Sequence, residues 1–427
     1  MSPRNAPKRA PSLDNNRCHR WYSFIQAFSA QLVRHVLSKF SYSSGIIVDP
    51  FVGTGTTCVE CKIQGIPSFG IDANPMAVFA TRVKTTWDLD IQAIQQEKES
   101  LLSNIQPKFR NLTISSIHLL EHYIESQGIS REDLQAILAL LANKGIDPIL
   151  VGKCLIARGQ IEKVSDPKIR DFFGLALAST LVKAANVRSD PESGCIKPKV
   201  AVSVLQFFDD HTKMMISDLI HLQQLRAGET RIEQGDARLI LKFLGCKTVR
   251  GVITSPPYPL DTEYTRQTRL ELAILRHVHQ LKDLQRIEQT MIRGSRRQIF
   301  KGDHDFDQVQ DFPEIQAIIS KFVNQNQKVD DQNDYRKMYP RLLEEYFGGM
   351  NLHLKQLYEV LKPDGWAAYV VGDKILFKKI PIRTAEVLAK LAHRLGYKIK
   401  GIKFWRNRFS ADHKVPLPEN ILFLSKE

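Results

Sequence analysis

Apolar residues along the chain follow two spacings, and their alternation predicts a mixed α/β fold. The run GIIVD at residues 45–49 is short and apolar, as expected of a buried strand, and PSFGID at 67–72 repeats the pattern. A glycine-bearing turn and a helical stretch to about Gly65 lie between the two runs. This strand–turn–helix–strand unit is typical of the start of a parallel sheet.

Helical periodicity dominates much of the first half of the chain. Apolar residues recur at helical spacing through residues 17–40, and another helix is predicted after Asn74-Pro75. Between about residues 88 and 229 the pattern is mostly helical, with a predicted glycine cap at Gly145 and breaks that contain Pro and Gly. We interpret this region as a helical insertion that does not belong to the sheet.

Strand-like patterns return in the second half of the chain. They occur at residues 230–238, 249–258, 366–371, 398–406 and 420–425, with helices predicted at 350–361 and 382–396 and a turn at 362–365. The sheet-bearing domain is therefore predicted to comprise residues 17–87, 230–259 and 350–427. The helical insertion spans 88–229, a second, polar insertion spans 260–349, and residues 1–16 are expected to form a disordered basic arm.

Composition adds a class of partner to this picture. The chain has 427 residues and a formal net charge of +14, which suggests a polyanionic partner, with nucleic acid first. A basic protein with a merely solvated surface is the alternative. No apolar run approaches the roughly 18 residues of a membrane helix, and the N-terminus lacks the apolar core of a secretory signal. We therefore expect a cytoplasmic protein without membrane contact.

The six cysteines are scattered along the chain, which argues against a disulfide framework. Cys58 and Cys61 form a lone C-x-x-C pair without a second pair or partnering histidines, so we expect no metal site there. Both fall on the helix predicted after the first strand, and we interpret them as core residues.

The turn after the first strand has the features of a cofactor-binding loop. Gly53 and Gly55 allow a tight turn and close approach to a ligand, and the following helix offers free N–H groups. Asp72 ends the second strand, where a carboxylate can bind ribose hydroxyls. The sequence GTGTTC lacks the third glycine of a dinucleotide fingerprint and the lysine of a phosphate loop. These absences favour a nucleoside cofactor without phosphates, such as S-adenosylmethionine, and a purely structural turn is the alternative.

A second motif, TSPPY at residues 254–258, follows an apolar strand and is expected beside the glycine turn. Its two prolines remove backbone donors and leave carbonyl groups as acceptors. Ser255 and the Pro256 carbonyl suit the two protons of an exocyclic amino group, and Tyr258 suits stacking on the base. Such a base has to leave the double helix, so the motif predicts base flipping and catalysis by positioning, without a metal. A proline-stiffened loop is the alternative interpretation.

The stretches VDPFVGTGTT, FGIDANP and TSPPY resemble the cofactor and catalytic motifs of the amino-group DNA methyltransferases, which modify cytosine N4 or adenine N6. HRWYSFIQAFS resembles the aromatic helix that precedes the cofactor motif in members with this motif order. The resemblance covers roughly residues 17–87, 230–275 and 350–425 and leaves the insertions uncovered. It implies a Rossmann-like, seven-stranded class I methyltransferase sheet with an antiparallel last strand.

The resemblance also implies roles for individual residues. The methionine end of S-adenosylmethionine would be contacted by Asp49, Phe51, Gly53, Gly55 and Thr56. Asp72 would bind the ribose hydroxyls, Asp236 would lie near the adenine, and Phe24 and Phe28 would wall the pocket. The catalytic motif would comprise Ser255, Pro256, Pro257 and Tyr258.

The serine of TSPPY favours cytosine N4 as the target, because the serine form of the motif is commoner among the cytosine enzymes of this family. Carbon-5 methylation is excluded, since it needs a cysteine normally found in a Pro-Cys pair and no cysteine here follows a proline. The leading hypothesis is a site-specific methyltransferase of double-stranded DNA, in a restriction–modification pair or alone, with cleavage left to a separate endonuclease. The alternatives are adenine N6 in DNA, an amino group in RNA, and a non-catalytic nucleic-acid-binding protein.

Target readout is expected in the second insertion, directly after TSPPY. Its candidate DNA contacts are Arg266, Arg269, Arg293, Arg296, Arg297 and Lys301. Arginine side chains read guanine edges and lysines contact phosphates, whereas a solvated face is the alternative for any single charge. The helical insertion is the second candidate for readout, and residues 406–414 are a further candidate for backbone contact.

Overall fold

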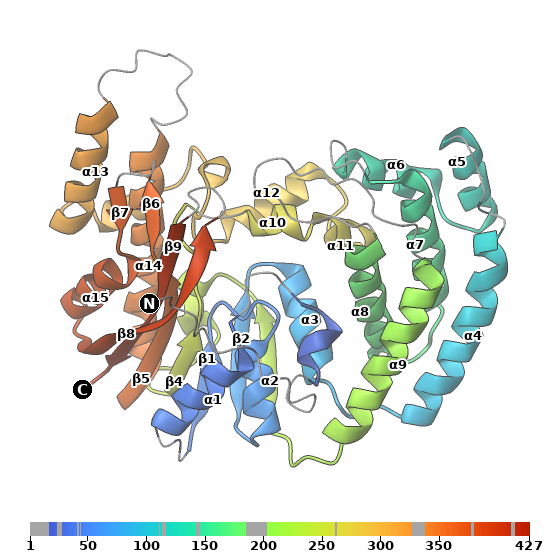
Figure 1. Ribbon diagram of the computed structural model, residues 1–427, viewed down its shortest axis with the longest axis horizontal. Helices are drawn as coiled ribbons and strands as arrows, with labels where there is room; N and C mark the ends of the chain where they lie inside the picture. Colours follow the sequence, from blue (N-terminus) through green and yellow to red (C-terminus); the bar gives the residue numbers. More distant parts are fainter. Residues whose placement is uncertain are drawn as a thin grey trace, which may run out of the picture.

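The computed structural model describes residues 17–23, 28–40, 42, 44–110, 112, 117–141, 146–184, 203–260, 263–326, 338–376, 380–410 and 415–427. The expected basic arm, Phe24 and the cap at Gly145 lie outside these residues. Figure 1 shows a sheet with helices on both faces and, beside it, a separate bundle of helices. No helix of the described part of the chain is long and apolar enough to cross a membrane.

Seven strands form the main sheet. They are β1 (Ile46–Asp49), β2 (Ser68–Asp72), β3 (Thr230–Gln234), β4 (Val249–Thr254), β5 (Leu361–Gly372), β8 (Lys398–Ser410) and β9 (Val415–Ser425). The spatial order is β3-β2-β1-β4-β5-β9-β8, and β9 is antiparallel to both of its neighbours while the other pairs are parallel. The expected Rossmann-like, seven-stranded sheet with an antiparallel last strand is therefore confirmed.

Helices cover the sheet on both faces. On one face lie α1 (Ala30–Lys39), α2 (Thr56–Ile63) and α3 (Pro75–Thr85), and on the other lie α14 (Tyr339–Val360) and α15 (Thr384–Arg394). The central strands are almost continuously buried, as expected of parallel strands with helices on both sides. Cys58 and Cys61 on α2 are both buried and free, in agreement with their interpretation as core residues.

The bundle consists of helices from the long segment between β2 and β3. They are α4 (Ile91–Arg110), α5 (Ile117–Ser126), α6 (Arg131–Leu140), α7 (Pro148–Ile161), α8 (Pro167–Ala184) and α9 (Val204–Leu222). Their apolar residues form one core that also takes in α3 and the N-terminal residues Cys18, Trp21 and Tyr22. The bundle is therefore joined to the sheet domain by continuous hydrophobic packing.

The segment between β4 and β5 crosses from the sheet domain to the bundle. It contains α10 (Tyr264–Gln267), α11 (Arg269–Ile274), α12 (Leu281–Gln289) and α13 (Pro313–Asn326), and Figure 1 shows α10, α11 and α12 between the sheet and the bundle. The Arg158 guanidinium of α7 donates a hydrogen bond to the Ile274 carbonyl oxygen at 3.0 Å. This segment thereby spans the carboxyl edge of the sheet, where the functional site is expected.

Three parts of the chain differ from the sequence prediction. Residues 362–365, predicted as a turn, lie within β5. Residues 17–40 do not form one helical stretch: a single 3-10 turn occupies His19–Trp21, and α1 begins only after Ser29, whose side chain caps it. Trp21 and Tyr22 pack in the core of the helical bundle. The spacing of the apolar residues in this segment therefore reflects tertiary packing, although it resembles the periodicity of a helix. A short hairpin of β6 (Lys374–Leu376) and β7 (Ile380–Ile382) was also not predicted.

Candidate active site

A cavity lies at the carboxyl edge of the sheet. Its walls come from the β1–α2 turn, the ends of β2 and β3, and the segment after β4. The sequence-predicted residues that line it are Phe28, Phe51, Gly53, Thr56, Asp72, Asp236, Ser255, Pro256, Pro257 and Tyr258. The two predicted motifs therefore face one shared space, although about 200 residues of chain separate them.

The β1–α2 turn depends on its glycines. Gly53 and Gly55 have φ values of 52° and 84°, in the left-handed region that side chains with a Cβ rarely adopt. A Cβ at Gly55 would lie 2.7 Å from the Thr81 side chain, and the Thr81 hydroxyl donates to the Gly53 carbonyl at 3.1 Å. The turn is thus held against α3, with its backbone open to a ligand at the start of α2.

Asp72 connects this turn to the end of β2. Its Oδ2 accepts a hydrogen bond from the Gly53 N–H at 2.9 Å, and its Oδ1 accepts one from the Asn74 N–H at 2.9 Å. Burial raises the pKa of Asp72 to about 6, although the backbone donors oppose the shift. Each carboxylate oxygen keeps a second lone pair, so the side chain can accept further hydrogen bonds from a ligand in the cavity.

Asp49, the last residue of β1, is fully buried behind the cavity wall. Its Oδ1 accepts hydrogen bonds from the Thr254 hydroxyl at 2.6 Å and the Phe51 N–H at 3.2 Å. Its Oδ2 has no hydrogen-bond partner among the described residues, because the nearby Thr57 hydroxyl donates to the Ile253 carbonyl instead. Burial raises the pKa of Asp49 to about 7. Asp49 and Gly55 are not among the residues that line the cavity, so neither of these two predicted cofactor contacts faces it directly.

Asp236 follows β3 and faces the cavity from the third side. It caps the 3-10 helix η2 (Ala237–Lys242) by accepting from the Arg238 N–H at 2.8 Å. The Arg238 guanidinium binds both carboxylate oxygens of Asp236 and also pairs with Asp305. Asp236 is therefore held in place by structural partners, while Gly235 and Ala237 on either side of it also line the cavity.

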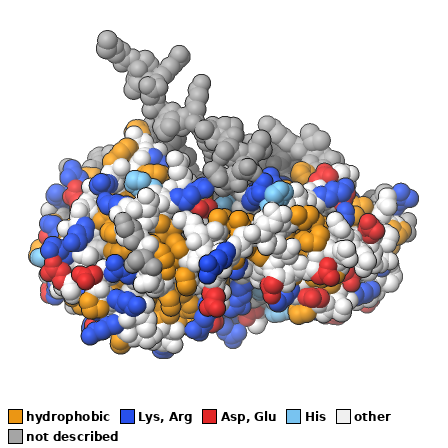
Figure 2. All heavy atoms as spheres, turned by 90° about the horizontal axis from the view of Figure 1, so that it is seen from below, with side chains coloured by type: hydrophobic (Ala, Val, Ile, Leu, Met, Phe, Trp, Pro, Cys, Tyr) orange, Lys and Arg blue, Asp and Glu red, His pale blue; other side chains and the backbone are white. Residues whose placement is uncertain are grey.

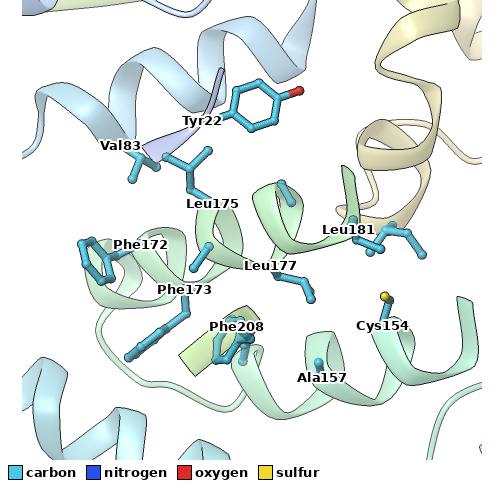
Figure 3. Packing of buried hydrophobic residues seen from close by; sticks show 14 of the residues in the cluster. Tyr22, Val83, Cys154, Ala157, Phe172, Phe173, Leu175, Leu177, Leu181 and Phe208 are labelled. Carbon is cyan, nitrogen blue, oxygen red and sulfur yellow. The ribbon is translucent and has the colours of Figure 1, made fainter. Parts of the chain in front are cut away.

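Tyr22 closes the cavity on the bundle side, a role that sequence reasoning did not assign to it. Figure 3 shows its ring between α3 and α8, with the hydroxyl pointing away from the apolar cluster. That hydroxyl donates to Glu271 Oε1 on α11 at 2.7 Å, and burial raises the pKa of Glu271 to about 7. The only signal in the sequence was the bunching of aromatic residues near Trp21.

Lys84 on α3 ties the N-terminal segment to the glycine turn. Its buried ammonium donates to the backbone carbonyls of Thr54 at 3.0 Å, His19 at 3.3 Å and Tyr22. Burial lowers the pKa of Lys84 to about 8. Thr54 and Tyr22 both line the cavity, so one side chain fixes two of its walls relative to each other. Nothing in the sequence distinguished this lysine from the other basic residues.

The TSPPY loop leaves β4 at the edge of the same cavity. The Ser255 hydroxyl lies 3.0 Å from the Val370 carbonyl and 3.3 Å from the Tyr258 hydroxyl, and its single proton can satisfy only one of them. The Pro257 carbonyl accepts from the Tyr346 hydroxyl at 2.9 Å. Tyr258 is almost fully buried and donates to Glu419 at 2.8 Å. Ser255 therefore retains acceptor capacity toward the cavity.

The predicted DNA contacts have different environments. Arg293 is 3% exposed, its guanidinium is paired with Asp303 at 2.6 Å, and it also donates to the Glu288 carbonyl. The prediction that Arg293 contacts DNA is therefore wrong, because its buried guanidinium binds Asp303 and the Glu288 carbonyl within the same loop. Arg266, Arg269 and Arg296 are half-buried, and Arg296 lies over the Tyr339 ring. Arg297 and Lys301 are exposed, and Arg297 lies 3.8 Å from Glu263.

The net positive charge is not concentrated on the face seen in Figure 2. There, basic and acidic side chains are interspersed around hydrophobic patches on the described surface. This face gives no reason to place a polyanion on it. Among the described residues, no group of three or more His, Cys, Asp or Glu side chains is arranged to hold a metal ion.

Comparison with known proteins identifies similar chains. The N6/N4 DNA methylase family matches residues 6–81. The Type II methyltransferase M.BsoBI of Geobacillus stearothermophilus is 20% identical over 90% of this chain and 79% of its own length. The Type II methyltransferase M.AvaI of a Nostoc species is 22% identical over 90% of this chain and 80% of its own length. M.MjaII of Methanocaldococcus jannaschii, also a Type II methyltransferase, is 34% identical over 94 residues, 22% of this chain and 18% of that protein.

Among solved structures, the rRNA methyltransferase aviRa from Streptomyces viridochromogenes aligns with a TM-score of 0.31 and 11% sequence identity. The alignment covers 100% of this chain and 96% of that one.

Proposed function

Because the chain belongs to the amino-group DNA methyltransferases, which take their methyl group from S-adenosylmethionine, we propose that it methylates the N4 amino group of cytosine in double-stranded DNA. The observation that carries the proposal is the position of Ser255 and Tyr258 in the same cavity as Asp72. A methyl donor held by the glycine turn and an amino group held by the TSPPY loop would meet in this space.

The residues present fit S-adenosylmethionine. Asp72 offers spare acceptor capacity for ribose hydroxyls, and Asp49 lies behind the wall that would hold the methionine part, where it accepts a hydrogen bond from the Phe51 N–H. Phe51, Gly53 and Thr56 line the cavity next to Asp49, while Gly55 forms the turn itself. Phe28 and Tyr22 supply apolar walls, and Asp236 lies at the end of β3 for the adenine side. When bound, this cofactor supplies a methyl group on a positively charged sulfur.

The chain's own residues would bind and orient the target base. The amino nitrogen of cytosine is a poor nucleophile because its lone pair is delocalised into the ring. Hydrogen bonds from its two protons to Ser255 Oγ and to the Pro256 carbonyl would hold the nitrogen in the geometry for attack, and Tyr258 would stack on the ring. The base has to leave the double helix to reach this buried loop, so flipping is part of the proposal.

Ser255 supports cytosine over adenine, by the resemblance of TSPPY to the serine form of the motif. A neutral serine accepts one hydrogen bond from the amino group without adding a charge to the site. The relatives described as Type II methyltransferases support a role in restriction–modification. In that setting, a separate endonuclease would recognise the same sequence.

Analysis of host DNA tests the proposal directly. The protein and its Tyr258→Ala variant would be expressed in a methylation-deficient host, and the DNA would be digested to nucleosides for mass spectrometry. We expect N4-methylcytosine with the wild-type chain and none above the empty-vector level with Tyr258→Ala.

Other outcomes separate the alternatives. N6-methyladenine would retain the mechanism and overturn the choice of base. If DNA contained neither product and the host RNA carried a new methylated amino group, DNA would be the wrong substrate. As a control on folding, Tyr258→Ala is expected to bind S-adenosylmethionine in calorimetry with nearly wild-type affinity, because its ring lies beyond the glycine turn.

A further inference from the structure

A buried glutamate lies directly behind the TSPPY loop. Glu419 on β9 is 3% exposed, and its Oε1 accepts the hydrogen bond of the Tyr258 hydroxyl at 2.8 Å. Its Oε2 accepts a hydrogen bond from Arg406 on the neighbouring strand β8. Both carboxylate oxygens are thus engaged in charge-assisted contacts, which are stronger than neutral ones. The sequence motifs gave no role to this residue.

Pairing of β9 with β5 and β8 fixes the position of Glu419 along the sheet, next to Tyr258. Glu419 pairs with Gly372 where β9 meets β5, and with Arg406 where β9 meets β8. A Cβ at position 372 would lie 2.8 Å from the Tyr258 ring, so Gly372 makes room for the ring next to Glu419. Strand pairing on both sides therefore leaves the carboxylate little freedom to move relative to β5.

The tyrosine ring is held at a second point. The Arg408 guanidinium lies over one face of the ring, 4.9 Å from its centroid. A base can then stack only on the opposite face. Residues of β9 and β8 thus hold the hydroxyl and one face of the ring, whereas Tyr258 itself lies in a loop after β4. A loop residue that has to stack on a flipped base benefits from such external support, since misplacement of a reacting group by about 1 Å can cost a hundredfold in rate.

We propose that Glu419 is a positioning residue for methyl transfer, which fixes the ring of Tyr258 through its hydroxyl and is itself oriented by Arg406. The inference rests on the proposed function, since it assigns a purpose to the geometry of the TSPPY loop. Glu419 is not among the residues that line the cavity. Its effect would therefore fall on the turnover rate and leave cofactor binding nearly unchanged.

A double-mutant cycle tests the inference. Tyr258→Phe removes only the hydroxyl, and Glu419→Leu removes its acceptor together with the partner of Arg406. Each should lower kcat on the order of tenfold to a hundredfold while the KM for S-adenosylmethionine stays within about twofold. The double variant should be no slower than the slower single variant, because both changes break the same contact. Glu419→Gln keeps an acceptor oxygen and should recover most of the rate.

Glu386→Leu is the matched control, since Glu386 is an exposed glutamate on α15 and its loss should leave kcat unchanged. Fully additive effects in the double variant, or a wild-type kcat in Tyr258→Phe, would overturn the inference. If Glu419→Leu fails to fold, the kcat values of Tyr258→Phe and Glu419→Gln still test whether the contact between the two side chains matters. A wild-type chain that methylates no nucleic acid would instead refute the proposed function, and the two failures are thereby distinguished.

Discussion

Burial disfavours the ionised form of two carboxylates, Asp72 in the lining of the cavity and Asp49 behind it. Burial raises the pKa of Asp72 to about 6 and that of Asp49 to about 7, so both hold protons at a pH at which the unfolded chain has released them. The folded state then binds more protons than the unfolded state between about pH 4 and 7, and the stability of the free protein falls as pH rises through this window. A ligand that donates hydrogen bonds to the Asp72 carboxylate would offset the cost of its burial.

The affinity for S-adenosylmethionine should therefore depend on pH. An ionised carboxylate accepts hydroxyl hydrogen bonds more strongly than a neutral one, so affinity should rise as pH increases through about 6 and level off above about 7. Asp72→Asn should bind more weakly and lose most of this rise near pH 6. Calorimetric titrations from pH 5 to 8 would measure both effects. An affinity that was flat in the wild-type chain, or equally steep in Asp72→Asn, would refute the role of Asp72.

Residues with a local motif were accessible from the sequence, and residues with a tertiary partner were not. Asp72 and Ser255 could be identified because each directly follows or ends a strand next to a recognisable turn. Glu419 could not, since its partner Tyr258 comes from the loop after β4 and its partner Arg406 from β8, and no spacing marks either contact. Arg293 shows the reverse error: its charge suggested DNA, but the ion pair with Asp303 appears only in the folded chain.

At the scale of elements, the bundle holds the short N-terminal segment against the cavity. The Asp218 carboxylate of α9 accepts hydrogen bonds from the Trp21 indole at 3.1 Å and from Arg20, and the Ser179 hydroxyl of α8 donates to the Trp21 carbonyl at 2.7 Å. The sequence predicted the helices of the bundle but did not predict that they hold the N-terminal segment. Its contacts to Trp21 span about 160 and 200 residues, beyond the reach of any periodicity.

Lys84 should couple this segment to the glycine turn, and Lys84→Met tests the coupling. The substitution leaves three buried carbonyl oxygens without their donor, so we expect the free energy of unfolding to fall by about 1–3 kcal/mol. Affinity for S-adenosylmethionine should also fall, on the order of tenfold, because Thr54 and Tyr22 lose their common anchor. Denaturant unfolding and calorimetry would give the two quantities.

Lys62→Met is the control for this substitution. Lys62 on α2 is half-buried, whereas Lys84 is fully buried, and it too donates to a backbone carbonyl, that of Gly228 at 3.1 Å. This contact lies at the amino edge of the sheet, away from the cavity. It should lower stability without changing cofactor affinity. Equal losses of affinity in both variants would mean that the cavity responds to general destabilisation and that Lys84 has no special part in it.

At the scale of the whole molecule, the net charge of +14 should appear as salt-dependent binding of DNA. Each phosphate neutralised by a basic side chain releases counterions, so log K should fall linearly with log salt concentration. Arg297 and Lys301 are the exposed members of the predicted set, and both belong to the segment that borders the cavity through Thr290, Met291 and Ile292. They are therefore the candidates for phosphate contact close to the catalytic loop.

Replacing both residues by alanine should reduce the slope of log K against log salt by about 2, one for each lost phosphate contact. Fluorescence anisotropy with a DNA duplex between 50 and 200 mM salt covers the range in which such losses are measurable. Arg226→Ala is the control, because Arg226 is exposed in the loop that enters β3 from the opposite edge of the sheet. An unchanged slope in the double variant would mean that DNA does not contact this segment, and the helical bundle would become the candidate for DNA contact. A reduced slope in Arg226→Ala would show that the overall charge, and no particular face, attracts the DNA.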